Sequence, residues 1–484
     1  MGREDRWQDF TSVQNLVRRT GMWDTLDLFL RENEYSAVPG QTDLLLHFNS
    51  DSARDQTGGY GLERGRTLIA AQVRVLGEAS AGFNDDSRGL KLEPGPQTLF
   101  ARGTRWGDFT IEFWLRPELS GDGEEVLTWV GSRWQGGRVS PQEVRCALRS
   151  RRLVWEFVNF FVAEGGGTPG SASAGTGANP PPSPVIRLEG LTPLLPRAWR
   201  HHLLRFDSGT GLLEYLMDGV PEAVSYAVAG PGGGGPPLTP YVGEADSAPL
   251  YLGRGFTGFM DELRISRALV EDPVLARFDG RAGVAVSMPL DLGYTGTRLK
   301  RIEAVYRAES DSGIFFSYRL ADRMSGDQLD GDWVQFKPGA SLSEARGRWV
   351  QLRVELFPDG RGSVTPQLSE LRVVYEQDLP PAPPAGVQAV AGNAQVRLRW
   401  NVVREEDVRG YLVYYGPSPG NYHGTGADRG ASPLDVGAAT ELTLAGLENG
   451  RLYYFAVVAY DATDPPHRSA FSREVSARPT GALR

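Results

Sequence analysis

The chain has 484 residues, and a single hydrophobic core stops growing near roughly 250–300 residues, so two to four domains are expected. Its formal net charge of -9 disfavours a nucleic-acid partner, which requires a basic face. No apolar run of about 18 residues occurs, so no membrane span is expected, and a single cysteine, Cys146, excludes an intramolecular disulfide.

Residues 1–40 are expected to form an N-terminal extension that contains a short helix and a strand. Apolar residues at helical spacing predict the helix near residues 8–19; they are Phe10, Val13, Leu16 and Val17. Leu26, Leu28 and Leu30 alternate with other residues, which favours a strand. The first residues are polar and include no apolar signal region.

From Leu44 onward the hydrophobic period is two, which indicates strands with one face in a core. The clearest strand spans 108–117, where Phe109, Ile111, Phe113 and Leu115 share one face. Further strands are expected at 152–162, 199–206, 212–218 and 259–266. Turn-rich segments separate these strands, as in a β-sandwich, and we expect one domain over 41–280.

Two low-complexity stretches, 165–184 and 229–240, interrupt this first domain with runs of glycine and proline. Such runs bury too little apolar surface to offset the entropy lost on ordering. Because strand signals resume after each stretch, we interpret both as loops within one domain. Linkers between domains are the weaker alternative.

A second β region covers 285–377 and is interpreted as an accessory β-sandwich. In its strand at 349–356, Val350, Leu352, Val354 and Leu356 share one face. A proline-rich linker at 378–385 follows, which is expected to be semi-rigid. A last β region covers 386–480. The predicted fold class is therefore all-β, with three sandwiches in tandem.

The first domain resembles the bacterial laminin-G-like branch of the concanavalin A-like jelly rolls. The matching segments follow the family's order and are 44–49 with the turn 55–58, 108–117, 199–207, 215–219, and 252–253 with 259–265. Each segment is a weak signal alone, and the specificity lies in their order over some 220 residues. The resemblance implies a jelly roll, a fold that serves both glycan binding and glycan hydrolysis.

The last domain resembles a fibronectin type III domain. Val396, Leu398 and Trp400 match its second strand with the core tryptophan. Tyr453 matches the tyrosine-corner residue, whose hydroxyl bonds back to the upstream backbone. Trp400 and Tyr453 are thus expected to be structural residues.

A hydrolase on the concanavalin-like fold needs two carboxylates on one strand face, about 5–5.5 Å apart in retaining enzymes. The nearest candidate, Asp261-Glu262, lacks the first carboxylate of the Glu-x-Asp-x-x-Glu pattern. As neighbours in a strand, Asp261 and Glu262 are expected to point to opposite faces. We therefore expect no catalytic residues and no enzymatic activity.

Calcium is the one cofactor that the resemblance suggests. Related jelly rolls often hold a structural calcium ion between the opening loop and the closing strand, and here Asp55 and Asp261 occupy those places. Calcium prefers six to eight oxygen ligands, and the loop 49–55 is rich in oxygen. The alternative for Asp55 is an Asx turn. His201 and His202, adjacent in a strand, are expected to face opposite ways, without zinc-ligand spacing.

Glycan binding uses aromatic platforms, and Trp114, Trp129, Trp134 and Trp155 lie on or near expected strands, where core packing is the commoner role. We expect a non-catalytic binding or scaffolding protein whose first domain binds a glycan or an envelope or surface protein. A polysaccharide-active enzyme and a structural subunit of an envelope or filament assembly are the alternatives. An extracytoplasmic location is expected if this chain lacks its signal peptide; neither the ligand-binding residues nor an oligomeric state follow from the sequence.

Overall fold

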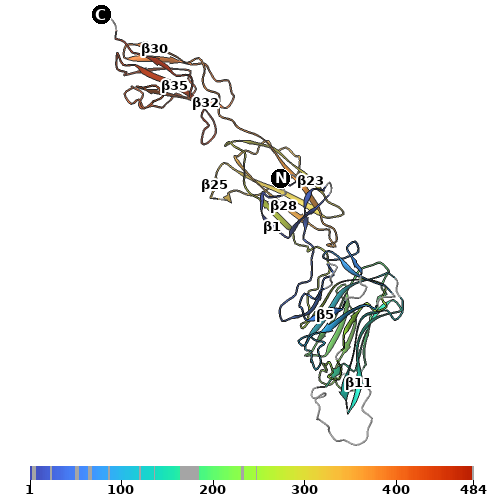
Figure 1. Ribbon diagram of the computed structural model, residues 1–484. Coiled ribbons are helices and arrows are strands. Elements are labelled where there is room, and N and C mark those ends of the chain that lie inside the picture. Colours follow the sequence, from blue (N-terminus) through green and yellow to red (C-terminus); the bar gives the residue numbers. More distant parts are fainter. Residues whose placement is uncertain are drawn as a thin grey trace. The chain divides into compact units, whose positions relative to one another are not determined.

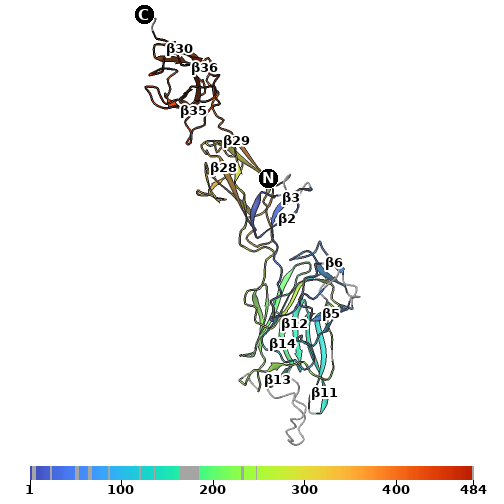
Figure 2. The same cartoon turned by 60° about the vertical axis from the view of Figure 1, so that its left-hand side comes forward.

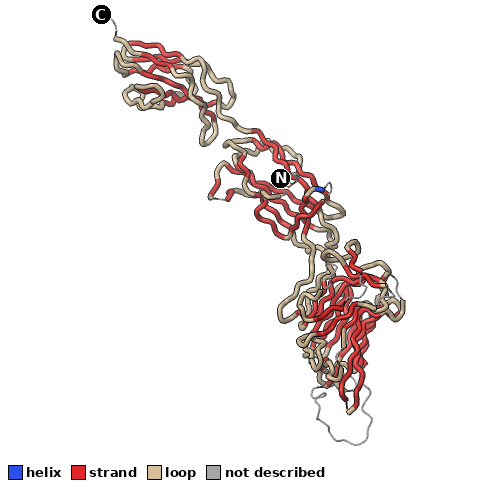
Figure 3. The backbone as a smooth tube through the Cα atoms, viewed as in Figure 1, coloured by secondary structure: helices blue, strands red, loops and turns tan. Residues whose placement is uncertain are grey.

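The computed structural model describes residues 1–2, 7–21, 24–49, 54–63, 68–84, 88–118, 121–135, 137–163, 185–230, 234–246, 248–326 and 328–481. Apart from one 3₁₀ position at Asp24, these residues form antiparallel strands and loops (Figure 3), which confirms the all-β fold class. The described part of the chain has no helix long and apolar enough to cross a membrane. The chain divides into two compact units, one of residues 31–280 and 360–364, the other of residues 1–30, 281–359 and 365–484.

The unit of residues 31–280 is a jelly roll of two large sheets (Figure 2). Its eight-stranded sheet contains, in order, β17 (Val220–Tyr226), β16 (Leu212–Met217), β15 (Arg200–Asp207), β9 (Phe109–Pro117), β20 (Gly258–Ser266), β7 (Ser80–Phe83) and β6 (Leu68–Ala70), with β4 (Thr42–Leu46) also paired to β20. Its seven-stranded sheet contains β14 (Val185–Glu189), β12 (Arg152–Val158), β11 (Arg138–Arg149), β10 (Glu125–Gln135), β19 (Leu250–Leu252), β8 (Leu90–Pro94) and β5 (Tyr60–Glu63).

The core of the jelly roll lies between these two sheets. The predicted inward face of β9 is fully buried there, and Cys146 of β11 packs in the same core. Because this site is apolar, burial raises the pKa of the Cys146 thiol well above its ordinary value. The thiol is therefore a small hydrophobic group of the core.

The outer face of the eight-stranded sheet is also covered. Thr110, Glu112 and Trp114 alternate with the core residues of β9, yet all three are buried. Tyr35 and Leu76 pack against Trp114 on this side. The alternation of polar and apolar residues along β9 could not predict that this outer face is buried, because the segments that cover it come from elsewhere in the chain.

Of the two predicted glycine- and proline-rich loops, 165–184 lies outside the described residues. In 229–240 the Ala229 N–H donates to the Pro236 carbonyl at 2.9 Å and the Leu238 N–H donates to the Ala227 carbonyl at 2.7 Å. β18 (Thr239–Pro240) then pairs with β13 (Phe161–Val162). The described ends of the second stretch are thus closed by backbone hydrogen bonds within the jelly roll.

The other unit holds the middle sandwich (Figure 1). Its first sheet contains β1 (Phe10–Gln14), β21 (Gly283–Ser287), β28 (Trp349–Phe357), β24 (Gly313–Ala321) and β27 (Val334–Phe336), with β22 (Leu290–Asp291) also paired to β28. Its second sheet contains β2 (Leu16–Thr20), β3 (Leu26–Leu30), β29 (Gln367–Glu376) and β23 (Arg298–Arg307). β25 (Met324–Ser325) and β26 (Gln328–Leu329) form a short hairpin.

The prediction of a helix near residues 8–19 is wrong, and residues 1–30 are not an extension. Their described residues form β1, β2 and β3. β1 pairs with β21, β2 with β3, and β3 with β29, so these strands complete both sheets of the middle sandwich. Asn15, at φ 53°, makes the tight turn between β1 and β2. The apolar spacing was misleading because β21, the partner of β1, and β29, which pairs with β3, lie more than 250 residues away. The jelly roll is inserted between β3 and β21.

The same unit ends in another β-sandwich, in the range where the sequence predicts the fibronectin type III domain. One sheet contains β30 (Gln388–Gly392), β31 (Gln395–Arg399) and β34 (Glu441–Ala445). The other contains β33 (Leu434–Asp435), β32 (Val408–Gly416), β35 (Tyr453–Asp461) and β36 (Val475–Ala477). Its core includes Val396, Leu398, Tyr411 and Phe455.

A substitution of Trp7 tests whether the N-terminal segment belongs to the core of the middle sandwich. Its side chain is fully buried, and its Nε1 donates to the Leu26 carbonyl at 2.7 Å. Trp7→Ala should lower the free energy of unfolding by about 3–5 kcal/mol, as a large core truncation does. Val13→Ala, at a position 36% exposed on β1, should change it by less than about 0.5 kcal/mol. Urea unfolding followed by circular dichroism measures both; equal, small effects would mean that the segment lies outside the core.

Candidate functional site

A closed polar cluster lies on the outer face of the eight-stranded sheet. Arg264 Nη2 lies 2.6 Å from Glu112 Oε1, and His201 Nε2 lies 3.2 Å from Glu112 Oε2. The Tyr35 hydroxyl completes the cluster, 2.8 Å from His201 Nε2. Burial opposes ionisation of Glu112, but the hydrogen bond from His201 and the charge of Arg264 outweigh burial and lower its pKa.

Asp261 and Glu262 both face this outer side, contrary to the expectation of opposite faces. The pairing of β20 with β9 shifts register between Asp261 and Arg264, and Glu262 adopts φ 47°. This β-bulge inserts one residue into the alternation, so two successive side chains point the same way. Glu262 lies 2.9 Å from His47 Nδ1 and accepts the Tyr35 N–H at 3.1 Å.

These carboxylates are not arranged for glycoside hydrolysis. Glu112, Asp261 and Glu262 are each 0% exposed, and Glu112 and Glu262 are held by Arg264, His201 and His47. A glycosidase instead presents its two carboxyl groups to a bound sugar. In this arrangement the cluster fastens the segment around Tyr35 to the sheet.

Asp55 does not fit a calcium ion. Its Oδ1 accepts the backbone N–H groups of Leu45 and Thr57, at 3.1 and 3.0 Å. Its Oδ2 accepts the Thr57 hydroxyl at 2.7 Å and the N–H groups of Gly59 and Tyr60 at 2.8 and 3.0 Å. These donors use the lone pairs that a cation needs, and their positive ends surround the carboxylate. The geometry is that of the Asx turn.

Asp261 does not fit a calcium ion either. Its Oδ2 accepts the N–H groups of Val75 and Leu76 at 2.9 and 3.2 Å, and burial raises its pKa to about 8. A carboxyl group that keeps its proton at neutral pH is a poor ligand for a hard cation. Among the described residues, no group of three or more metal-ligating side chains includes Asp55 or Asp261.

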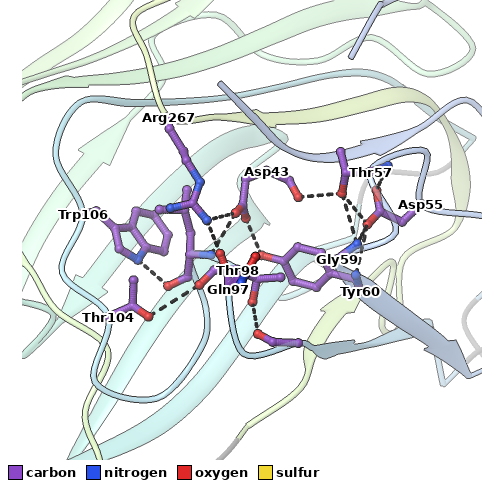
Figure 4. A network of polar contacts seen from close by, with 12 residues as sticks. Asp43, Asp55, Thr57, Gly59, Tyr60, Gln97, Thr98, Thr104, Trp106 and Arg267 are labelled. Carbon is purple, nitrogen blue, oxygen red and sulfur yellow. Dashed lines mark hydrogen bonds and ion pairs between the residues drawn. The ribbon is translucent and has the colours of Figure 1, made fainter. Parts of the chain in front are cut away.

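An open polar pocket lies at one end of the jelly roll, around Asp43 and Arg267 (Figure 4). Asp43 is buried, and its Oδ1 accepts from Arg267 Nη2 at 2.5 Å and from the Leu99 N–H at 2.9 Å. The Tyr60 hydroxyl donates to its Oδ2 at 2.6 Å. Asp43 thereby joins the beginning of β4 to β5, to the loop after β8 and to the end of β20.

The pocket has a volume of about 580 Å³ and is lined by small and polar residues. The lining comprises Gly40, Thr42, Asp43, Thr57, Gly58, Gly59, Gly95, Pro96, Gln97, Thr98 and Arg267. Arg267 Nη2 also donates to the Gln97 carbonyl at 2.5 Å. Its Nε and Nη1 have no hydrogen-bond partner in the described part of the chain, so they can bind an oxygen of a ligand.

Sequence reasoning missed this pocket. Asp43 and Arg267 are 224 residues apart, and neither stands in a motif that marks a binding residue. The only signal was indirect: both lie at the ends of predicted strands that the jelly-roll resemblance makes neighbours.

The tryptophans considered as glycan platforms differ in exposure, and the two expected structural residues make core or backbone contacts. Trp114, Trp129 and Trp155 are buried, whereas Trp134 of β10 is 57% exposed. In the last sandwich, Trp400 is buried against Tyr411, with ring centroids 5.7 Å apart. The Glu448 N–H donates to the Tyr453 hydroxyl at 3.1 Å, which is a bond from the upstream backbone.

Fold and site together define an all-β protein of β-sandwich domains with an open polar pocket on one of them. No family model matches the chain. Over 103 residues, the chain is 35% identical to a Kelch domain-containing protein of Saccharolobus solfataricus. This match covers 21% of the chain, which spans only 13% of the length of that relative.

Solved structures are similar to parts of the chain. Domain 4 of AbnA, a GH43 extracellular arabinanase from Geobacillus stearothermophilus, is similar over 47% of this chain and 92% of that domain, with 15% identity and a TM-score of 0.28. The CBM40 of Ruminococcus gnavus IT-sialidase is similar over 44% and 94%, with 11% identity and a TM-score of 0.25. The third fibronectin III domain of the human KIAA0343 protein is similar over 22% and 88%, with 20% identity and a TM-score of 0.17. At these sequence identities and TM-scores, the similarities give no evidence about function.

Asp55→Asn should lower the free energy of unfolding by at least about 3 kcal/mol, because buried N–H donors lose a charged acceptor. The loss should be the same with and without added Ca²⁺. Asp207→Asn is the matched control: Asp207 caps an exposed turn through Gly209 and Thr210, so its loss should be much smaller. Chemical unfolding measures both. A stabilisation by Ca²⁺ that Asp55→Asn abolishes would show that Asp55 binds calcium after all.

Asp261→Asn should remove a pH dependence of stability. The ordinary pKa of 3.8 applies to the unfolded chain and about 8 to the folded one, so the folded state binds more protons between these values. The stability of the natural protein relative to the variant should therefore fall as pH rises through this window, by up to about 1.4 kcal/mol per pH unit. Unfolding curves of both proteins across this range measure the difference; a difference independent of pH would mean that Asp261 is ionised in the fold.

Proposed function

We propose that this chain is a non-catalytic, extracytoplasmic binding and scaffolding protein of a bacterial envelope or secreted assembly. The jelly roll, a laminin-G-like domain in this proposal, binds a glycan or a surface protein. The middle sandwich and the fibronectin type III domain serve as spacers. The observation that supports this proposal is the fixed, open guanidinium of Arg267 in the polar pocket.

The Asp43 ion pair prepares Arg267 for binding. Since Arg267 Nη2 is used by Asp43 and by the Gln97 carbonyl, its side chain is held in one orientation before a ligand arrives. A preorganised donor loses less conformational entropy on binding than a mobile surface arginine. Hydroxyl groups of a sugar or a carboxylate oxygen match the remaining donors in chemistry.

Catalysis is the less favoured function because the carboxylates of the outer sheet face are buried and mostly paired. The pocket itself contributes one carboxylate, Asp43, and that group is engaged by three donors. A polysaccharide-active enzyme would need a second carboxyl group beside it.

The test is a glycan array, followed by capture of proteins from an envelope extract, with the whole chain as the probe. Arg267→Ala should weaken binding at least tenfold, which corresponds to about 1.4 kcal/mol. Arg197→Ala is the matched control, because Arg197 pairs with Glu118 at 3.0 Å and lies outside the pocket. Melting curves show whether each variant folds.

A folded Arg267→Ala variant that binds like the natural protein would reject this pocket. The exposed Trp134 would then be the next position to change. Absence of any glycan or protein ligand would leave the structural subunit as the better proposal.

A further inference from the structure

Three metal-ligating side chains meet where the linker enters the last sandwich. Asp378 lies two residues after β29, Asp461 ends β35, and His467 closes the loop that follows. One ligand atom from each, two carboxylate oxygens and an imidazole nitrogen, lie within 4.8 Å of one another. The three residues come from two segments about 80 residues apart in the sequence, so no local motif marks them.

Two of these ligand atoms are buried and have no hydrogen bond. The Asp461 side chain is 0% exposed and the His467 side chain 11% exposed, and Asp461 Oδ2 lies 2.8 Å from His467 Nδ1. Despite this distance, neither atom makes a hydrogen bond of acceptable geometry within the described residues. Buried polar atoms are rarely left in this state, because each loses its interaction with water without compensation.

Hydrogen bonds from the loop after Asp461 orient its carboxylate toward His467. Asp461 Oδ1 accepts the N–H groups of Thr463 and His467 at 3.1 and 2.9 Å. Since these bonds occupy Oδ1 and fix the carboxylate plane, Oδ2 is left facing His467. The Tyr294 ring packs against the His467 imidazole in a T-shaped arrangement, with centroids 5.6 Å apart, and limits its rotation.

The space beside Asp378 is kept free by a glycine. A Cβ atom at Gly296 would lie 2.6 Å from Asp378 Oδ2 and 3.0 Å from Thr463 Cγ2. Gly296 also has φ 77°, a conformation that other residues rarely adopt. A side chain at this position would therefore displace the Asp378 carboxylate from the cluster.

We propose that Asp378, Asp461 and His467 bind a zinc ion. Imidazole nitrogen and carboxylate oxygen are zinc ligands, and three protein ligands leave a fourth, tetrahedral position for water. Calcium and magnesium prefer sets made only of oxygen, and the imidazole of His467 disfavours them.

The bound ion would join the start of the proline-rich linker to the last sandwich. Asp378 belongs to the linker, whereas Asp461 and His467 belong to β35 and its following loop. A metal bond between them would hold Asp378 of the linker against the last sandwich. Zinc would therefore stiffen the junction between the middle sandwich and the fibronectin type III domain, a role that suits a spacer.

The experiment is calorimetric titration of the metal-free whole chain with Zn²⁺, and with Ca²⁺ in parallel. We expect one zinc ion per chain and no heat from Ca²⁺ at this site. Asp378→Asn should weaken zinc binding at least about tenfold. Even the mutation of a residue that only hydrogen-bonds to a metal ligand typically causes a loss of that size. Asp378 lies outside the strands, so this variant should fold. His467→Ala should bind no zinc at this site.

His423→Ala is the matched control, because His423 is an exposed histidine of the same sandwich outside the cluster. It should bind zinc as the natural protein does. Zinc should also raise the melting temperature of the natural protein and of His423→Ala, but not that of Asp378→Asn. Absence of zinc binding by the natural protein, or unchanged binding by both Asp378→Asn and His467→Ala, would overturn the proposal.

Discussion

The pairing of the first thirty residues with strands near the middle of the chain is the interaction on which the rest of the structure depends. β1 joins β21, and β3 joins β29, so each sheet of the middle sandwich contains strands from both sides of the jelly-roll insertion. Closing a chain over some 250 residues is less costly than its length suggests, because the entropy of closure grows only with the logarithm of length. The insertion reduces this cost further: the Asn33 N–H donates to the Arg277 carbonyl at 2.8 Å, so its two ends run side by side.

Several buried charges of the described residues are neutralised within the fold. Asp55 holds a turn, Asp43 joins strand and loop ends, and Glu112 fastens a covering segment through Arg264 and His201. Such groups stabilise only when each is paired, because an unpaired buried charge is costly. In the described part of the chain, Nε and Nη1 of Arg267 make no hydrogen bond, and Asp461 Oδ2 and His467 Nδ1 are among the buried side-chain atoms without one. The Arg267 atoms support a ligand pocket, and the Asp461 and His467 atoms support a metal site.

Local backbone geometry decides which of the acidic residues act together. Without the bulge at Glu262, Asp261 would face the outer side of the sheet and Glu262 the core. With it, both lie outside, where Glu262 meets His47 and Asp261 receives two backbone N–H groups. A single inserted residue thus places Glu262 beside His47 on the outer side of the sheet instead of in the core.

The all-β class and the inward faces of the long strands could be predicted from the sequence, because alternation is a local property of each strand. Phe109, Ile111, Phe113 and Leu115 could be assigned to a core in this way, and the resemblances drew attention to Trp400 and Tyr453. The fold was needed to show that Phe10 and Leu16 belong to strands, that N–H donors surround Asp55, and that Asp43 contacts Arg267. Each of these depends on partners far away in the chain, and neither spacing nor composition reports which distant segments the fold brings together.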